Sequence, residues 1–514
     1  MAGRFDAAID ALEKALGQSV ALRTWLRTRR WCGDAIDARM QLLVKDRARL
    51  AEAEGEAVAF FLLVARDPNT SLPVHVPLAV SAAKPEPEAF ELAAGPDRVY
   101  VSEGERRESY ARFLTEGFRD RLTVRTGSGD VLRFQGEAIG SFRSAEPFPD
   151  DSSNVLVRIA TTAGAFAFKS YKLLDVENRE PEILQRLHKK GFRHVPRYRG
   201  ELALGKGSDR LVLGVVTDHV PAKDVFAFLT EGWRGEFAGG PSPEFEAGSL
   251  DLAARLGEAT AALHAALVDG HPSPFQPEAF TAEDAEAATK AALTNLSDSL
   301  RRLAGLAKGP DERLRGLAAD ARMQVFERRD RIESVLLGLE RGVGTAKAVT
   351  HGDLHLAQVL RTEPGDLLFL DFEGEPERAP GQRAAKLPPL RDVATMNRSF
   401  AYVKHYAWRE ATKGDGTAAW RFHTRDGWTA EEDAAALRLA AWESAAVERY
   451  TRAYLAHSAA YASLESDEAL RAIRGWTMEK ALYELRYELK HRPQNIFIPL
   501  EGVLSLAAES EGPA

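Results

Sequence analysis

The 514-residue sequence contains a single cysteine, Cys32. One cysteine cannot form an intramolecular disulfide, so the composition fits a reducing compartment. No stretch reaches the roughly 18 consecutive apolar residues that a transmembrane helix needs, and the first residues lack the apolar run of a signal peptide. The sequence therefore predicts a cytoplasmic protein with no membrane partner.

An excess of positive charge is also absent, because 68 Lys and Arg residues stand against 76 Asp and Glu residues, giving a formal charge of −8. A surface with this balance does not attract nucleic acid over long range. The length allows two or three domains. The sequence leaves the oligomeric state open, with a monomer slightly favoured.

No glycine-rich G-x-G-x-x-G phosphate loop occurs in the chain. The segment 200–207 resembles a P-loop, but Gly207 stands where Ser or Thr would hold Mg²⁺. A strand at 211–217 follows it, where a P-loop would be followed by a helix. The sequence therefore predicts a hairpin turn here and not a nucleotide site.

Residues 351–373 carry the strongest chemical pattern. Asp353 lies in a polar loop, Gln358 follows five residues later, and a short apolar strand ends in Asp371. Phosphoryl transfer to a hydroxyl needs one carboxylate to orient and deprotonate the acceptor. It also needs an amide and a second carboxylate to hold Mg²⁺ against the phosphates. We therefore predict Asp353 as the catalytic residue and Gln358, Asp371 and Glu373 as metal ligands.

The motif His-Gly-Asp-Leu-His (351–355) resembles the catalytic loop of aminoglycoside-phosphotransferase-like kinases. Together with Gln358, Asp-Phe-Glu-Gly-Glu-Pro (371–376) and Pro-Leu-Arg-Asp-Val-Ala (389–394), it resembles the actinobacterial maltokinase group. The resemblance implies an α+β, bilobal, protein-kinase-like fold. It implies a β-rich cap subdomain over 1–97, a nucleotide-binding subdomain over 98–218 and a helical C-terminal lobe over 219–514.

The resemblance also implies structural roles near the loop. His351 is expected to organise the loop, and Arg391 and Asp392 are expected to tie it together through an ion pair with each other. An ordinary surface pair is the alternative for Arg391 and Asp392.

In kinases of this type, a strand lysine contacts the α- and β-phosphates and is held by a helix glutamate. Lys169 with Glu182 is the first choice, and Lys172 with Glu180 is the second. In place of a glycine-rich loop, Ser152 and Ser153 would contact phosphate. Backbone groups around Asp218 and Val220 would pair with the adenine edge.

Apolar spacing predicts the remaining elements. A helix is expected at 5–16, followed by antiparallel strands at 40–44, 57–65 and 74–80. Hairpins are expected at 122–135 and 154–171, with a helix at 179–189. Later helices are expected at 252–270, 281–306, 312–339, 429–457 and 471–490.

The acceptor pocket is expected on the last helix, where polar and aromatic residues recur at spacings of three and four. The substrate-binding candidates are Asp353, His355, Trp420, Lys480, Tyr483, Glu484, Tyr487, Glu488 and Gln494. Maltokinases continue Arg-Pro-Asp-Trp after this helix, whereas this chain has Arg-Pro-Gln-Asn (492–495). Loss of that tryptophan argues for a smaller acceptor, and acidic side chains suit an amino sugar.

The favoured function is therefore an ATP- and Mg²⁺-dependent kinase that converts glucosamine to glucosamine 6-phosphate, as in the glucosamine kinase branch of this group. A maltokinase that makes maltose 1-phosphate is the alternative, and an aminoglycoside phosphotransferase is the third option. A pseudokinase-like binding module would require a broken lysine, aspartate or metal ligand, and the sequence retains all of them.

Overall fold

The computed structural model divides the chain into two compact units. Unit 1 comprises Met1–His188 and Pro196–Pro221, and unit 2 comprises Lys189–Val195 and Ala222–Ala514. The predicted three-part division at 97 and 218 stays a prediction. The residues that the structure describes are 2–29, 31–32, 40–53, 55–68, 70–149, 153–175, 177–207, 210–239, 242–375, 377–378, 380–412 and 428–508.

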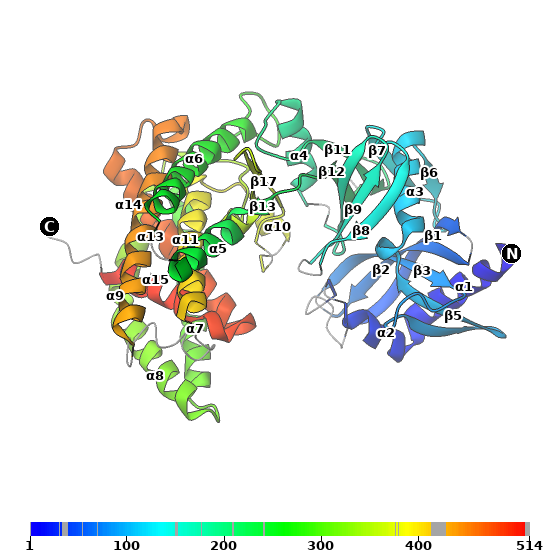
Figure 1. Ribbon diagram of the computed structural model, residues 1–514, viewed down its shortest axis with the longest axis horizontal. Coiled ribbons are helices and arrows are strands. Elements are labelled where there is room, and N and C mark those ends of the chain that lie inside the picture. The colour runs from blue at the N-terminus through cyan, green and yellow to red at the C-terminus, as the bar shows by residue number, and fades with distance from the viewer. Residues whose placement is uncertain are drawn as a thin grey trace. The chain divides into compact units, whose positions relative to one another are not determined.

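Unit 1 begins with a five-stranded antiparallel sheet in the order β1-β2-β3-β5-β4, on which helix α1 packs (Figure 1). Nearly every side chain of β2 is buried, as its unbroken apolar run predicts for a strand covered on both faces. The elements are α1 (Ala2–Gln18), α2 (Val20–Arg27), β1 (Gln41–Ala53), β2 (Glu56–Arg66), β3 (Ser71–Ser81), β4 (Phe90–Ala94) and β5 (Asp97–Glu103).

A seven-stranded sheet follows in unit 1, in the order β6-β7-β11-β12-β10-β9-β8. Helix α3 packs on it through Phe113 and Phe118, whose rings lie 5.3 and 5.1 Å from that of Phe134. The helix approaches closely at Gly117, where an added Cβ would lie 2.3 Å from the Phe134 ring. The elements are η2 (Gly104–Arg106), α3 (Glu108–Asp120), β6 (Thr123–Arg125), β7 (Val131–Gly136), β8 (Phe142–Pro147), β9 (Val155–Thr161), β10 (Gly164–Ser170), α4 (Glu180–Lys189), β11 (Tyr198–Leu204) and β12 (Leu211–Asp218).

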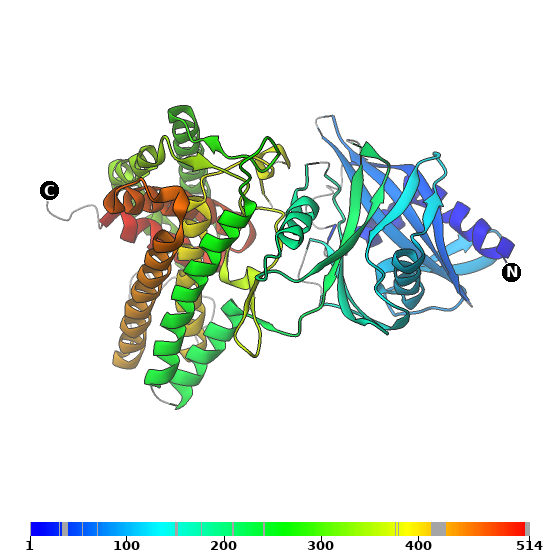
Figure 2. The ribbon, with the colours of Figure 1, turned by 90° about the horizontal axis from the view of Figure 1, so that it is seen from above.

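Unit 2 is mainly helical, and its long helices α6 and α13 run side by side (Figure 2). Large aromatic side chains fill its core; for example, the rings of Trp233 and Trp442 lie 5.4 Å apart in an edge-to-face arrangement. The helices are α5 (Val225–Gly239), α6 (Pro243–Leu267), α7 (Ala282–Leu306), α8 (Glu312–Glu327), α9 (Arg329–Leu336), α10 (Pro380–Arg383), α11 (Leu390–Thr412), α13 (Ala430–His457), α14 (Ser466–His491) and α15 (Phe497–Ala508).

Short strands in unit 2 carry the loop with the strongest sequence motif. The hairpin β16–β17 pairs with β13, and the motif residues lie just before and just after this hairpin. The remaining elements are β13 (Lys223–Asp224), β14 (Glu278–Ala279), η4 (Leu337–Gly342), β15 (Ala346–Lys347), η5 (Leu356–Gln358), β16 (Val359–Arg361), β17 (Leu367–Phe369), η6 (Ala459–Tyr461) and η7 (Pro493–Asn495).

Most predicted elements are confirmed, including the helices expected from 281 and 429, and in the structure each of these helices starts with a capping box, at Thr281 and at Thr429. The predicted hairpin after 204 is confirmed by the antiparallel pair β11–β12, although Ser208 and Asp209 lie outside the described residues. The single helix expected over 312–339 is wrong, because Arg328 leaves helical geometry with φ −99° and ψ 13°. Neither proline nor glycine marks this break in the sequence.

Among the described residues, no helix is both long and apolar enough to cross a membrane.

Candidate functional site

The loop that begins at His351 is held by a buried carboxylate from α11. The backbone N–H groups of His351 and Gly352 donate to Asp392 at 2.8 and 3.0 Å. His264 Nε2 lies 3.1 Å from the same carboxylate. Burial alone would raise the pKa of Asp392, but these hydrogen bonds and the charge of His264 lower it. The Asp392 side chain therefore fixes the start of the loop by binding the loop's backbone N–H groups.

The predicted ion pair between Arg391 and Asp392 is corrected by the structure. Arg391 donates to Glu375 at 2.7 Å and to Glu479 at 3.2 Å. Adjacent helix residues point about 100° apart, so the two neighbours reach different partners. Both side chains still contact the loop region, because Arg391 also donates to the Gly352 carbonyl at 3.4 Å.

His351 contacts two residues of the segment that directly follows β17. Its Nε2 lies 2.7 Å from the Leu370 carbonyl oxygen, and its ring lies 4.7 Å from that of Phe372. Both contacts join the two ends of the β16–β17 hairpin. The structural role assigned to His351 is consistent with them and stays a prediction.

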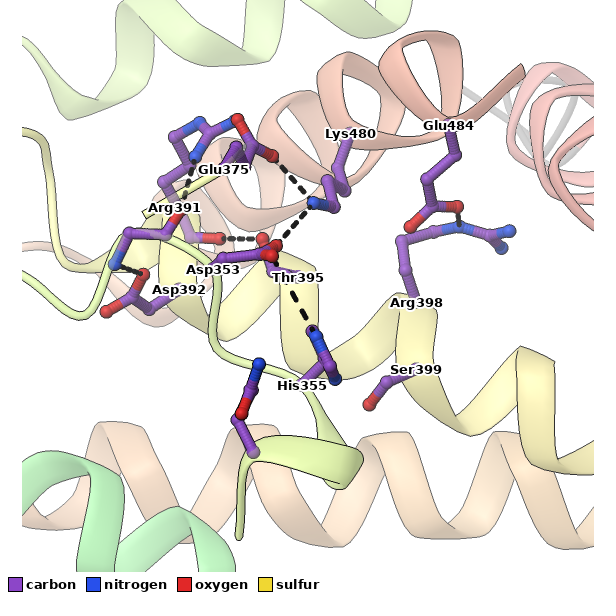
Figure 3. Close-up of polar contacts among 12 residues, drawn as sticks. Asp353, His355, Glu375, Arg391, Asp392, Thr395, Arg398, Ser399, Lys480 and Glu484 are labelled. Atoms are coloured by element: carbon purple, nitrogen blue, oxygen red, sulfur yellow. Dashed lines mark hydrogen bonds and ion pairs between the residues drawn. The ribbon is translucent and has the colours of Figure 1, made fainter. Parts of the chain in front are cut away.

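Asp353 is the carboxylate that the loop presents (Figure 3). Its side chain is 19% exposed, and its Oδ1 accepts from Lys480 Nζ at 3.1 Å. His355 Nε2 lies 3.8 Å from Asp353 Oδ2. Lys480 comes from α14, 127 residues further along the chain. The structure thus places two of the predicted substrate-binding residues, His355 and Lys480, beside the predicted catalytic residue.

Lys480 also belongs to a buried charge cluster around Glu375. Its Nζ donates to Glu375 at 2.6 Å, and Arg378 and Arg391 bind the other oxygen of that carboxylate. Burial alone would raise the pKa of Glu375, but the charges of Arg391, Lys480 and Arg378 hold it well below its usual range. Burial alone would lower the pKa of Lys480, but the charges of Glu375 and Asp353 raise it. The neighbouring carboxylates therefore favour the charged form of Lys480.

The sequence reasoning missed three members of this cluster. Glu375 lies within the quoted motif, two residues after Glu373, and Glu479 precedes Lys480 directly. Their positions beside predicted site residues are the signal that could have found them. Arg378 has no comparable signal.

The predicted metal ligands lie at the two ends of the β16–β17 hairpin. Gln358 Nε2 donates to Asp371 Oδ2 at 2.9 Å, which leaves the amide oxygen of Gln358 as the atom that would bind a cation. Asp371 has φ +63°, a left-handed conformation that costs of order 1–3 kcal/mol for a residue other than glycine. With Glu373, these side chains offer the hard oxygen donors that Mg²⁺ prefers. The residues present therefore fit Mg²⁺.

Two carboxylates on α14 follow Lys480 at intervals of four residues. Glu484 accepts from Arg398 Nε at 2.9 Å, and Glu488 Oε1 accepts from Tyr402 at 3.0 Å and from Arg492 at 2.7 Å. Glu488 Oε2 has no hydrogen-bond partner among the described residues. Burial raises the pKa of both carboxyl groups.

The other residues predicted to bind the acceptor differ from one another in burial. Tyr483 is buried, and its ring stacks on that of Tyr487 with centroids 6.2 Å apart. Burial raises the pKa of Tyr483 above its usual range. Gln494 is exposed in η7. Trp420 lies outside the described residues.

The predicted lysine pair in unit 1 needs a correction. Lys169 on β10 donates to Glu180 at 2.7 Å, whereas Glu182 is exposed. Glu180 is the first residue of α4, and Glu182 lies about 200° further around the helix. The second choice, Lys172 with Glu180, is also wrong, because Lys172 pairs with Glu105.

The other predicted nucleotide contacts are placed in part. Ser153 is exposed, and Ser152 lies outside the described residues. The Asp218 carboxylate accepts from Arg199 at 2.5 and 3.0 Å. Val220 follows it without entering β12. The nucleotide roles of these residues stay predictions.

Comparisons with known proteins find similar sequences and a similar fold. A family model described as "Phosphotransferase enzyme family" matches residues 144–423, more than half of the chain. A glucosamine kinase of Streptacidiphilus jiangxiensis is 28% identical over 317 residues, which cover 60% of this chain and 61% of the relative. A glucosamine kinase of Mycolicibacterium smegmatis is 28% identical over 34% of this chain and 37% of the relative.

A solved structure of a glucosamine kinase in complex with glucosamine, ADP and inorganic phosphate superposes with a TM-score of 0.61. The identity is 21%, and the match covers 93% of this chain and 96% of that one. The family model and this superposition confirm the α+β kinase-like fold predicted from the sequence.

Proposed function

Because the chain belongs to the phosphotransferase enzyme family, we propose that it is a kinase that transfers the γ-phosphoryl group of ATP to a hydroxyl of a small sugar. Glucosamine is the favoured acceptor and glucosamine 6-phosphate the favoured product. The names of the two curated relatives support this choice. The observation that carries the proposal is the position of Asp353, a partly exposed carboxylate. Lys480 binds its side chain, and Asp392 binds the backbone of the neighbouring Gly352.

Asp353 would accept the hydrogen bond of the attacking hydroxyl and take its proton late in the reaction. The transition state of phosphoryl transfer is loose, so positioning and charge matter more than the basicity of Asp353. Lys480 holds one carboxylate oxygen, which leaves the other to face the acceptor. Lys480 also brings a positive charge close to where the phosphoryl group would be transferred.

Gln358, Asp371 and Glu373 would hold Mg²⁺. Bound Mg²⁺ neutralises phosphate charge as phosphoryl transfer proceeds. Lys169, held by Glu180, would contact the phosphates of ATP. ATP and the sugar are the proposed partners, and a cytoplasmic location stays a prediction from the sequence.

The spacing on α14 favours an acceptor with one sugar ring. Lys480 marks the position of Asp353, Glu484 lies about 6 Å further along the helix axis, and Glu488 lies about 12 Å further. A hexose whose hydroxyl meets Asp353 would bring a ring amino group near Glu484, whereas a disaccharide would extend toward Glu488. The side chain of Glu484 is 10% exposed and that of Glu488 is 1% exposed, so Glu484 is the more accessible.

ADP release with ATP and Mg²⁺ would test the proposal against glucosamine, glucose, N-acetylglucosamine, maltose and an aminoglycoside. We expect glucosamine to give the highest kcat/KM and NMR of the product to show phosphate on the 6-hydroxyl. Maltose giving the highest value would reject the one-ring acceptor. Absence of ADP release with every sugar would reject the kinase assignment.

The Glu484→Gln variant tests the ammonium contact, with Glu488→Gln as its matched control. We expect the ratio of kcat/KM for glucosamine over glucose to fall about tenfold in Glu484→Gln and to stay within about twofold in Glu488→Gln. The ratio cancels any general loss of active enzyme, including any caused by the unpaired Arg398. Equal ratios in both variants would remove Glu484 from amino-group recognition.

A further inference from the structure

Strand β10 of unit 1 ends between two glutamates that lie on opposite faces of the chain. On one face, Glu180 Oε2 accepts from Lys169 Nζ at 2.7 Å and from Tyr171 Oη at 2.6 Å. Lys169 is the residue proposed to contact phosphate. Successive side chains of an extended strand point to opposite faces. The side chains of Ser170 and Lys172, which alternate with Lys169 and Tyr171, therefore point away from α4.

On the other face, Glu105 of η2 binds the alternate side chains. Its Oε1 accepts from Ser170 Oγ at 3.1 Å and from Lys172 Nζ at 2.5 Å. The side chains of Lys172 and Glu105 are 1% and 0% exposed. Four successive residues thus bind two glutamates in strict alternation.

The burial of Lys172 restricts its movement. A buried ammonium group must keep its partner, because an unpaired charge in the interior is strongly destabilising. The Lys172 Nζ also lies 4.4 Å from the centre of the Trp31 ring, a cation–π contact. Trp31 is held in turn by a 2.6 Å hydrogen bond from its Nε1 to Glu103. The lysine is therefore fixed by groups from the N-terminal part of unit 1.

Backbone hydrogen bonds join the same residues to β3. The N–H of His75 donates to the Lys172 carbonyl at 2.8 Å, and the N–H of Leu174 donates to the Pro73 carbonyl at 2.9 Å. His75 Nδ1 lies 3.1 Å from the Tyr171 carbonyl oxygen. The segment 172–174, directly after β10, is therefore paired with β3 of the five-stranded sheet.

We propose that Glu105 and Lys172 are a positioning pair through which the N-terminal sheet sets the direction of Lys169 toward the nucleotide phosphates. The inference rests on the proposed function, since it takes Lys169 as a phosphate contact. Lys172 lies three residues after Lys169 on the same extended segment, so a shift of the buried pair moves the segment that carries Lys169. Because both side chains are buried, the pair would act through Lys169 and not by contacting the nucleotide itself.

The test compares Glu105→Gln and Lys172→Met with the wild-type protein. We expect KM for ATP and Kd for ADP to rise about tenfold, while KM for the sugar stays within about twofold. A purely structural role would lower the fraction of folded protein, and thus apparent kcat, without changing KM or Kd. Unchanged KM and Kd in both folded variants would overturn the proposal.

The double variant Glu105→Gln/Lys172→Met removes both charges and leaves neither unpaired. We expect its Tm to return toward that of the wild type while Kd for ADP stays raised. Recovery of Kd together with Tm would overturn the proposal in favour of simple packing.

Glu56→Gln is the matched control. Glu56 lies on β2 of the same sheet and binds Arg107 at 2.8 Å and Ser109 at 2.5 Å. We expect a lower Tm with unchanged Kd for ADP; an equal rise in Kd would show that any damage to the sheet has this effect and would overturn the proposal.

Calorimetry of ADP binding separates this proposal from the proposed function. Weaker ADP binding in the two single variants, without turnover of any sugar by the wild type, would support the pair and reject the sugar kinase. Normal sugar turnover by the wild type, with unchanged ADP binding in the two single variants, would support the sugar kinase and reject the positioning pair.

Discussion

Glu375 in unit 2 and Glu105 in unit 1 are both buried and both bind a lysine, but their pKa values are shifted in opposite directions. In unit 2, the pKa of Glu375 lies well below its usual range, because three cations outweigh the effect of burial. In unit 1, burial and the charge of Glu103 raise the pKa of Glu105, because the single lysine does not outweigh them.

The number of cations around each glutamate therefore decides the direction in which its pKa is shifted. The Glu375 cluster can lose one cation and remain paired through the others. The Glu105 pair cannot lose its lysine without leaving a buried charge. We expect substitutions around Glu375 to change turnover, and those around Glu105 to change nucleotide affinity.

The largest effect is expected from Asp353→Asn, which removes the carboxylate that the Glu375 cluster holds through Lys480. We expect kcat to fall by at least about 1,000-fold, with Tm and ADP binding near those of the wild type. Steady-state kinetics and calorimetry would measure both. The control is Asp366→Asn, because Asp366 is exposed in the connection between β16 and β17. This substitution should leave kcat, Tm and ADP binding unchanged. Normal turnover by Asp353→Asn would refute the catalytic role.

Asp371→Asn tests whether turnover also depends on a residue of unit 2 that lies outside the Glu375 cluster. Asparagine tolerates the left-handed conformation seen at Asp371, so the fold should survive. We expect kcat to fall about 100-fold and the Mg²⁺ concentration for half-maximal activity to rise, because a charged oxygen donor is lost. A Mg²⁺ titration would check this. An unchanged Mg²⁺ requirement would remove Asp371 from the metal site.

Lys480→Met should have a smaller effect on turnover, because Asp353 remains in place. We expect kcat to fall about tenfold and Tm to fall by a few degrees, since Glu375 keeps Arg391 and Arg378. Arg378→Met removes one cation from Glu375 without touching Asp353, so its kcat should stay within about threefold of the wild type. Equal losses of kcat in both variants would show that the cluster acts only through stability.

The smallest expected effect is a difference between the two units in how their stability depends on pH. The pKa of Glu377 falls from its usual 4.5 to about 2, because hydrogen bonds from Lys490 and His491 outweigh its burial. Its contribution to stability is present above pH 4.5 and is lost as the pH falls toward 2. The raised pKa of Glu105 has the opposite sign and adds no acid sensitivity.

Hydrogen exchange between pH 5 and pH 3 would therefore show earlier loss of protection around Glu377 than around Glu105. Glu377→Gln should flatten the pH dependence of Tm over this range. The same acid midpoint in both proteins would exclude Glu377 as a source of acid sensitivity.

The sequence was sufficient where the chemistry is local. Asp353, Gln358 and Asp371 lie within one short segment, and the sequence predicted the polar loop and the short apolar strand of this segment, although not the pairing of β16 with β17. Lys169 was likewise placed on its strand by simple alternation of apolar residues.

The partners of these residues were much harder to predict. Lys169 was assigned the wrong glutamate because the sequence does not say which face of α4 turns toward β10, and Glu180 and Glu182 point about 200° apart on that helix. Lys480 meets Asp353 across 127 residues, and Arg398 meets Glu484 across 86. No pattern of spacing along a chain specifies such contacts, because they depend on how helices from distant segments pack.

The pairing of β3 with residues 172–174, directly after β10, has a consequence for how this protein can be divided. A chain shortened to begin after β3 would expose the N–H and carbonyl groups at 172–174 and would uncover Lys172. The N-terminal sheet is therefore not a module that can be cut away or grafted onto another enzyme, although its fold is separate from that of the second sheet. Exchange of segments between related proteins should succeed only when β3, η2 and β10 are inherited together.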